Sequence, residues 1–470
     1  DNQIPQASIS PNMSEQTKNK SGYNLVEGSI RKSLIRMTAP MIVGMLMLFT
    51  FSLVDTLFIS ILGTESLTAI SFTFPVTFMV ISMAIGLGIG ASAVVGSYLG
   101  RSDFAKAKQA STVICYISLI LATIIVAFCW YFMDEIFHLM GASEQLMGPI
   151  REYMVVWFPG SILIVCIFTG NSLLRANGNT KTPSILMAVA GLVNAVLDPL
   201  FIFGLGPFPA LGIQGAALAT LIAWIIGFVY LLHLLAFKLE LISRVMPSRS
   251  VMASSGREML RIGIPAAGAN MMTPLAAGIM TAIAAGFGDT AVAAFGVGAR
   301  LEPIATLLIL AMSSSLPPLI SQNYGAGRMD RVEEAYRLST RFILGWQLLV
   351  YIALAAGASI IAGVFSDDAD VVSTIRLFVW ILPLSYGFQG IIILTNSSLN
   401  AMHRPLSALY LSFTRFFLFY VPLAFVGSLL FGLPGFFAGA FLGNLVMAVI
   451  SWRTFNSALH GEQQILEKAA

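Results

Sequence analysis

Long apolar segments separated by short polar connections dominate the chain from residue 37 to residue 455. Each segment has roughly the 20 mostly apolar residues that a helix needs to cross about 30 Å of hydrocarbon. The connections between them leave no room for a soluble domain. The pattern therefore predicts an all-α polytopic membrane protein. We expect twelve spans, at residues 37–62, 66–98, 110–133, 149–172, 184–205, 213–237, 262–286, 291–320, 341–365, 374–397, 406–430 and 434–455.

Composition agrees with this pattern and narrows the class of protein. Hydrophobic residues make up 57% of the chain, charged residues only 10%, and the mean hydropathy is +0.83. A water-soluble protein of this length is excluded by these values. The net charge of +3 gives no reason to expect a nucleic-acid partner. Residues 1–30 are polar and are expected to form a disordered arm.

The basic residues predict the orientation of the chain in the membrane. If the N-terminus is cytoplasmic, 22 of the 26 Lys and Arg residues fall in cytoplasmic segments. Such an excess is the pattern that orients helical membrane proteins. We therefore expect a multi-pass protein of the cytoplasmic (inner) membrane with both termini inside.

An internal repeat divides the chain into two halves. One constant shift in residue number, which takes Arg36 to Arg261, also relates other positions up to Gly100 to positions in the second half. Both halves start on the same side, as in transporters with parallel repeats about a central site. Further pairs are Pro40 and Pro265, Gly63 and Gly288, and Gly100 and Gly325. We expect an N-terminal arm (1–30), an N-lobe (31–237), a linker (238–261), a C-lobe (262–455) and a C-terminal tail (456–470).

Two carboxylates lie inside predicted spans, Asp55 in the first and Asp198 in the fifth. A charge at the centre of a spanning helix costs about 2.5–3.5 kcal/mol on insertion scales, so such residues usually belong to ion or proton pathways. The repeat places Met280 opposite Asp55 and Tyr420 opposite Asp198. Any ion chemistry is therefore expected in the N-lobe alone.

Further oxygen donors can join these carboxylates. Asn194 lies four residues before Asp198, on the same helical face, and Pro199 frees a backbone carbonyl one turn back. Thr220, near the start of the sixth span, adds a hydroxyl. This set suits either an oxygen cage for Na⁺ or a coupled proton site. The alternative is a polar group that only holds helices together.

Two other residues have more than one interpretation. Pro40 either marks a helix start or, if the first helix begins before Arg36, lies within it as a kink. Glu302, inside the eighth span, either lines a substrate cavity and meets a cationic ligand or makes a structural hydrogen bond.

Several motifs resemble those of the multidrug and toxic compound extrusion (MATE) family. They are LVDTLFIS in the first span, NAVLDPLFIFG in the fifth, GIQGAALAT opening the sixth, and ARLEP and SQNYGAG in the eighth. The resemblance covers residues 24–455 and is strongest to the DinF-like branch. It implies two bundles arranged in a V and efflux of cationic, amphipathic drugs in exchange for H⁺ or Na⁺.

The resemblance also implies roles for single residues. Asp55, Asn194, Asp198 and Thr220 match the family's N-lobe cation site, with Tyr153 as an aromatic hydrogen-bonding partner and Pro40 as a bending point. We expect a monomer without cofactor that is not an enzyme. The alternatives are a flippase for a lipid-linked oligosaccharide from the same superfamily and, from another class, an intramembrane enzyme.

Overall fold

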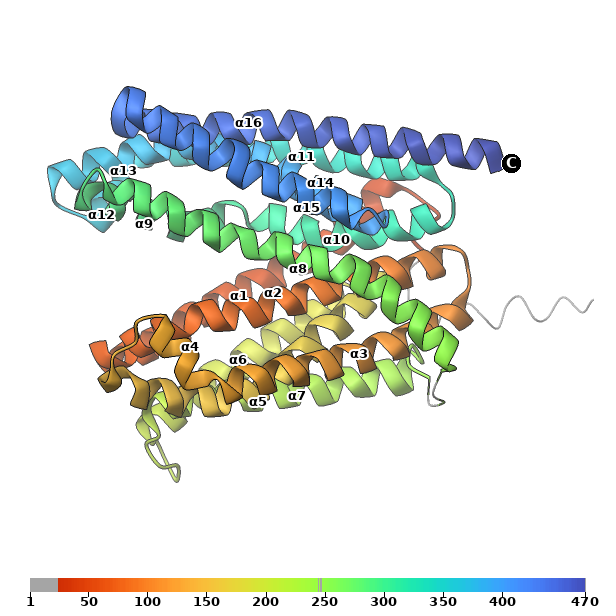
Figure 1. Ribbon diagram of the computed structural model, residues 1–470, viewed down its shortest axis with the longest axis horizontal. Coiled ribbons are helices and arrows are strands. Elements are labelled where there is room, and N and C mark those ends of the chain that lie inside the picture. The colour runs from red at the N-terminus through yellow and green to blue at the C-terminus, as the bar shows by residue number, and fades with distance from the viewer. Residues whose placement is uncertain (1–23, 244, 246, 470) are drawn as a thin grey trace, which may run out of the picture.

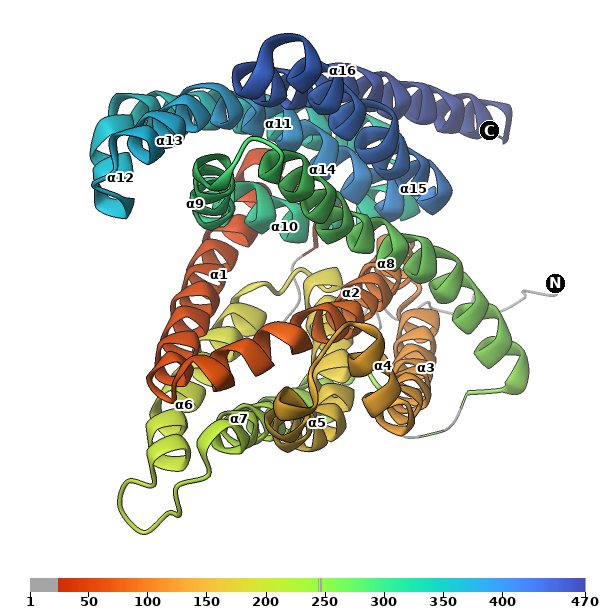
Figure 2. The same ribbon diagram turned by 60° about the vertical axis from the view of Figure 1, so that its left-hand side comes forward.

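The backbone of a chain this apolar must satisfy its hydrogen bonds internally, which in lipid leaves helices or closed barrels. The structure, a computed structural model, describes residues 24–469 apart from 244 and 246, and this part of the chain contains helices and no strand. Figures 1 and 2 show two bundles that meet at one end and diverge toward the other. The V-shaped all-α fold expected from the sequence is thus confirmed.

The first bundle, the N-lobe, contains the helices up to residue 238. They are α1 (Ile30–Ile61), α2 (Thr64–Gly100), α3 (Phe104–Tyr131), α4 (Met133–Leu139), α5 (Glu144–Ala176), α6 (Lys181–Phe203), α7 (Gly212–His233) and a π-helical turn η1 (Leu234–Lys238).

The second bundle, the C-lobe, repeats this arrangement with more interruptions. It consists of α8 (Arg249–Ala285), α9 (Asp289–Ala305), α10 (Leu307–Gly325), α11 (Met329–Ala356), α12 (Ala358–Phe365), α13 (Ala369–Ile381), a 3₁₀ turn η2 (Leu382–Ser385), α14 (Tyr386–Ala401), α15 (Pro405–Phe413), a π-helical segment η3 (Thr414–Tyr420) and α16 (Val421–Ala469).

These helices account for twelve spans within the described residues. Ten are long and apolar enough to cross a membrane, and α9 with α10, bent by 45° at their junction, form an eleventh. The stretch from Pro405 to Lys468 contains two spans, because the backbone leaves helical geometry at Gly432 (φ 63°, ψ −146°).

Some segment boundaries differ from those expected. Residues 249–261, expected within a linker, form the first turns of α8, and the expected tail from 456 continues α16 to Ala469. Residues 1–23 of the expected arm lie outside the described residues. Leu25, by contrast, is 2% exposed, and its N–H donates to Gln322 Oε1 at 3.1 Å. A buried anchor residue therefore holds the end of this polar segment against the C-lobe.

Backbone angles are similar at positions that the sequence repeat relates. Gly63, before α2, has φ 109° and ψ 171°, and Gly288, before α9, has φ 95° and ψ 176°. These angles are costly for any residue with a Cβ atom. The two lobes therefore share the same turn at positions that the repeat relates.

The lobes touch through an equally symmetric helix crossing. A Cβ atom on Gly100 would collide with the carbonyl oxygen of Gln322, and one on Gly325 with the carbonyl oxygen of Ser97. Ser97 and Gln322 are themselves a pair related by the repeat. The C-terminal ends of α2 and α10 are thus in backbone contact about the pseudo-twofold axis. We name this region, where α1 also begins, the closed end, and the opposite region the far end.

Hydrogen bonds between the lobes lie at the closed end. Thr38 Oγ1 and Ser315 Oγ are 2.7 Å apart, and Gln322 Nε2 donates to the Ala176 carbonyl at 2.7 Å. His403 Nε2 lies 3.2 Å from the Ala93 carbonyl. In an apolar interior each such bond spares a buried polar group a cost of about 1–3 kcal/mol. Packing and hydrogen bonding therefore stabilise the same end.

We expect Gly100→Ala to weaken the closed end. The added Cβ would overlap the Gln322 carbonyl, so the two helices must separate, at a cost of about 1–3 kcal/mol. Gly345→Ala in α11 is the control, because a Cβ there meets no atom of residues 24–469, as far as these are described, within 4 Å. Thermal unfolding in detergent should show destabilisation for Gly100→Ala alone. Equal melting temperatures for both variants would contradict the tight crossing.

Candidate functional site in the N-lobe

Four helices of the N-lobe bring the predicted site residues together. Asp55 comes from α1, Tyr153 from α5, and Thr220 from α7, whereas Asn194 and Asp198 both belong to α6. Helix α6 contacts α1 and α7. All five side chains thus lie within one lobe.

Close packing of α1 on α6 sets the position of Asp55. A Cβ atom on Gly44 would lie 2.8 Å from the Ser184 Cα, and one on Gly191 would collide with the Phe51 ring. In both contacts the residue of α6 lies the same number of positions after its partner in α1. The two helices therefore run parallel, and their register does not change between the contacts. One turn beyond Phe51, the same register places Asp55 beside Asn194 and Asp198.

The two carboxyl groups contact each other. The side chains of Asp55 and Asp198 lie within hydrogen-bonding distance, and a carboxyl–carboxyl hydrogen bond requires a proton on one of them. Asp198 is fully buried, and Asp55 is partly buried. Asp55 Oδ1 and Asp198 Oδ2 are buried with no hydrogen-bond partner among the described residues. A proton shared between the two acids, or a bound cation, would satisfy these oxygens.

Asn194 holds the second oxygen of the Asp198 carboxyl group. Its Nδ2 donates to Asp198 Oδ1 at 3.1 Å and to Thr220 Oγ1 at 3.1 Å. An amide nitrogen has two hydrogens, so both are used. Tyr153 is close enough to interact electrostatically with Asp55 and Asp198. The structure thus brings the expected oxygen donors together, with Thr220 bound to Asn194.

Pro40 lies inside α1, which begins at Ile30, before Arg36. Of the two interpretations of this proline, the structure therefore supports the one in which it lies within the helix instead of at its start. A proline there removes one backbone hydrogen bond and is a common position for a bend. It lies two residues from Thr38, which bonds to the C-lobe. The bend-prone position is therefore near the anchored end of α1, and Asp55 is on the longer segment beyond it.

Glu302 belongs to a separate polar cluster in the C-lobe. Gln389 Nε2 of α14 donates to Glu302 Oε1 at 2.7 Å. Glu302 also interacts electrostatically with Tyr386, Arg415 and Tyr420. Gln389 is not among the site residues expected from the sequence, although it is the one amide in the apolar stretch YGFQGIIIL. The carboxylate therefore has a side-chain partner that the sequence alone did not assign.

Arg415 is fixed within this C-lobe cluster. The residue is buried in η3, and its Nε donates to Asn444 Oδ1 at 3.1 Å. Its guanidinium stacks over the Phe416 ring, 4.7 Å from the centroid. Asn444 in turn donates to Ser385 Oγ at 3.2 Å. The buried arginine is thus held by the protein itself, and π-helical segments such as η3 often occur at functional sites.

The sequence matches the model of a known protein family. The MatE family model matches residues 40–200 and again 265–426. The two matches start at Pro40 and Pro265, which are one of the residue pairs that define the repeat in the sequence. Matches to both halves agree with the duplicated fold.

Individual relatives give the same result. A protein of Shewanella oneidensis named FAD transporter is 40% identical over 92% of this chain and 95% of its own length. The multidrug export protein MepA of Staphylococcus saprophyticus is 25% identical over 89% and 92%, respectively. The crystal structure of the Vibrio cholerae MATE transporter VcmN in the bent form superposes with a TM-score of 0.88 at 33% identity, covering 93% of this chain and 98% of that one.

We expect Thr220→Val to remove one of the two hydrogen bonds that hold the Asn194 side chain in place, and so to lower the stability of the protein. The change keeps the shape of the side chain but removes the oxygen that accepts from Asn194 Nδ2. Loss of this bond should lower stability by about 0.5–1.5 kcal/mol. Thr123→Val in α3 is the control, since this exposed residue bonds to the Leu119 carbonyl of its own helix. Thermal unfolding of both variants tests this, and an unchanged Thr220→Val melting temperature would contradict the bond.

Proposed function

Because this chain belongs to the MATE family of membrane transporters, we propose that it is a secondary-active efflux antiporter driven by H⁺ or Na⁺. This proposal rests on the contact between the side chains of Asp55 and Asp198, two acids from different helices. Each of them has one oxygen to which no group in the described part of the chain donates a hydrogen bond. Such a pair can exchange a proton or a small cation with little rearrangement. The ion is cargo of the transport cycle, and Asp55, Asp198, Asn194, Thr220 and Tyr153 are the residues that would receive it.

The proposed orientation places the closed end in the cytoplasm. The closed end carries most of the basic residues, and basic residues concentrate on the cytoplasmic side of helical membrane proteins. The structure then corresponds to a state that faces the exterior. In this state the outer part of α1 is accessible, since Leu53 is 68% and Leu57 60% exposed.

The proposed cycle couples the ion to α1. An ion that enters from outside neutralises the remaining negative charge of the Asp55–Asp198 pair. Helix α1 can then bend at Pro40 while its start stays bonded to Ser315 through Thr38. The bend would displace a bound drug to the exterior. Return to the other state would follow release of the ion inside.

A cationic, amphipathic substrate fits the charges of the interior. Asp55, Asp198 and Glu302 supply three acidic groups, against one buried arginine among the described residues, Arg415, whose Nε is bonded to Asn444. Glu302 is half-buried, its side-chain hydrogen bond comes from the neutral amide of Gln389, and Arg415 is the buried positive charge that interacts with it. The relative MepA, named as a multidrug export protein, supports export of drugs.

A second candidate substrate is FAD, since the relative of 40% identity is named as an FAD transporter. FAD carries a negatively charged diphosphate. Its export would require groups other than the acidic residues named above. The two candidates therefore differ in the sign of the charge that the interior must accept.

We expect Asp55→Asn and Asp198→Asn each to abolish gradient-driven export while the protein still reaches the membrane. A loss of about tenfold or more in the export rate corresponds to a barrier that is higher by about 1.4 kcal/mol or more. Proteoliposomes with an imposed proton gradient, and then a sodium gradient, measure this with an ethidium-type dye. Asp289→Asn is the control, because this exposed acid lies in the first turn of α9, in the other lobe from the pair. Wild-type export in both pair variants would refute the coupling site.

The substrate class is tested by comparing dye and FAD in the same vesicles. We expect Glu302→Gln to reduce export of the cationic dye severalfold, because the residue loses its charge but keeps its shape. Glu334→Gln, an exposed acid on α11, should leave export unchanged. Export of FAD but not of dye by the wild-type protein would favour the second candidate.

A further inference from the structure

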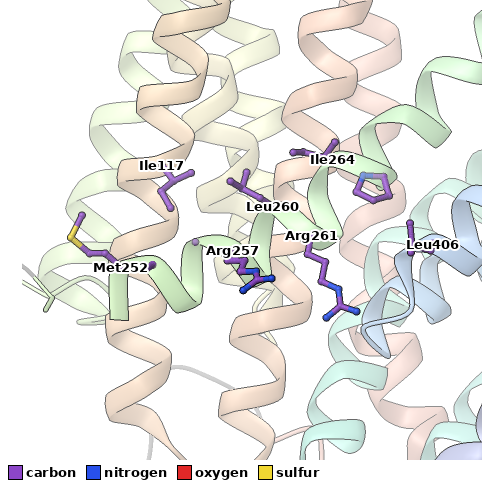
Figure 3. Close-up of a pocket in the computed structure, with 10 residues that line it drawn as sticks. Ile117, Met252, Arg257, Leu260, Arg261, Ile264 and Leu406 are labelled. Carbon is purple, nitrogen blue, oxygen red and sulfur yellow. The ribbon is translucent and has the colours of Figure 1, made fainter. Parts of the chain in front are cut away.

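A groove of about 680 Å³ lies where α8 passes between the two lobes. Its walls come from α8, from Ile117 of α3 in the N-lobe and from Leu406 of α15 in the C-lobe. Figure 3 shows that these side chains surround one stretch of α8. The groove therefore has walls from both halves of the protein and is separate from the carboxylate site.

Most of the groove lining is apolar and faces outward. Ile264 is 57% and Leu406 51% exposed, and Leu260 and Pro265 also line the groove. In a protein whose helices cross a membrane, such exposed apolar side chains contact lipid chains. The lining is thus suited to hydrocarbon.

Two arginines make one part of the groove positively charged. Arg257 and Arg261 are four residues apart on α8, so they share a face of the helix. Both are exposed. Figure 3 shows both guanidinium groups pointing to the same side, with Ile117, Leu260 and Ile264 above them in this view. The groove is therefore apolar along one part and doubly positive along the other.

Among the described residues, no carboxylate lies within 4 Å of either guanidinium. The acid next in sequence, Glu258, contacts His403 Nδ1 at 3.2 Å instead. Other basic residues of the closed end do have such partners; Arg404, for example, contacts Glu462 at 2.7 Å. The paired positive charge in the groove thus lacks an acidic partner within the described part of the protein.

We propose that this groove binds an anionic phospholipid from the leaflet at the closed end. Its phosphate would accept hydrogen bonds from Arg257 and Arg261, and an acyl chain would lie along Ile117, Ile264 and Leu406. Basic pockets between spanning helices are a recurring site for acidic lipid head groups. Guanidinium groups suit phosphate because they donate several hydrogen bonds in one plane. The apolar wall distinguishes a lipid from a free phosphate ion, for which it offers nothing.

The position of the groove links the lipid to the conformation of the transporter. Helix α8 packs against α2 of the other lobe, where a Cβ atom on Gly86 would lie 2.6 Å from the Ala267 backbone nitrogen. A lipid that touches α3, α8 and α15 together stabilises the arrangement in which these helices surround the groove. A ligand that prefers one of two states shifts the population toward it. Acidic lipid should therefore favour the state described here.

The test compares lipid retention by the purified full-length protein in nanodiscs. One set contains phosphatidylcholine alone and the other phosphatidylcholine with phosphatidylglycerol, and native mass spectrometry counts retained lipids. We expect the wild type to retain phosphatidylglycerol. The double variant Arg257→Gln/Arg261→Gln should bind it about thirtyfold more weakly, since two basic contacts are lost. Arg257→Lys/Arg261→Lys should keep most of the binding, because the charges remain.

The matched control is Arg341→Gln/Arg453→Gln, which removes the same charge from two other exposed arginines of the C-lobe. It should retain phosphatidylglycerol like the wild type. Equal loss in both Gln pairs would show a general charge effect and overturn the proposal. Inorganic phosphate that displaces the lipid completely would indicate an ion site instead. A wild type that retains no phosphatidylglycerol would overturn the proposal without any variant. None of these results depends on the coupling ion or the substrate.

Discussion

Backbone contact between α2 and α10 at the closed end is the constraint on which the rest of the structure depends. Gly100 lies against the Gln322 carbonyl and Gly325 against the Ser97 carbonyl, so the helices approach as closely as main chains can. Small residues permit such approach in membranes, where no hydrophobic effect drives helices together. Since the lobes are held at this end, they diverge toward the other (Figure 1). The V shape follows from where the small residues are.

The same scaffold carries different chemistry in its two halves. The glycine turns at Gly63 and Gly288 are equivalent in backbone and sequence. Asp55, by contrast, corresponds to Met280, which is fully buried in an apolar cluster of the C-lobe. Tyr420, opposite Asp198, lies beside Arg415 and Glu302. Duplication thus preserved the turns and the crossing that hold the lobes, while the buried polar groups diverged.

Helix α8 connects these features. One face packs on α2 of the N-lobe through Gly263 and Ala267, and another forms the wall of the basic groove. A movement of one lobe against the other must therefore change both contacts. In a bilayer the first contact involves only protein and the second also involves lipid. The composition of the surrounding membrane can act on the protein at this point.

Several properties followed from the sequence because they depend on local chemistry or on repetition. Apolar length determined the twelve spans, the constant offset between repeated positions determined the two lobes, and helical spacing placed Asn194 on the face of Asp198. The twelfth span is a clear example. The helical run from Val421 is interrupted by the backbone of Gly432, yet two apolar lengths were already visible in the sequence.

Other properties required the tertiary structure, because they depend on contacts between helices distant in sequence. Spacing along one helix could not show that α1 packs on α6 in a register that joins Asp55 to Asp198. It also could not show that Gln389 reaches Glu302, or that Leu25 is buried against Gln322. Periodicity tells which face of a helix is polar, but not which face of another helix it meets. The sequence by itself determined the spans, the duplication and the acids of one lobe, whereas only packing decided which of these groups touch.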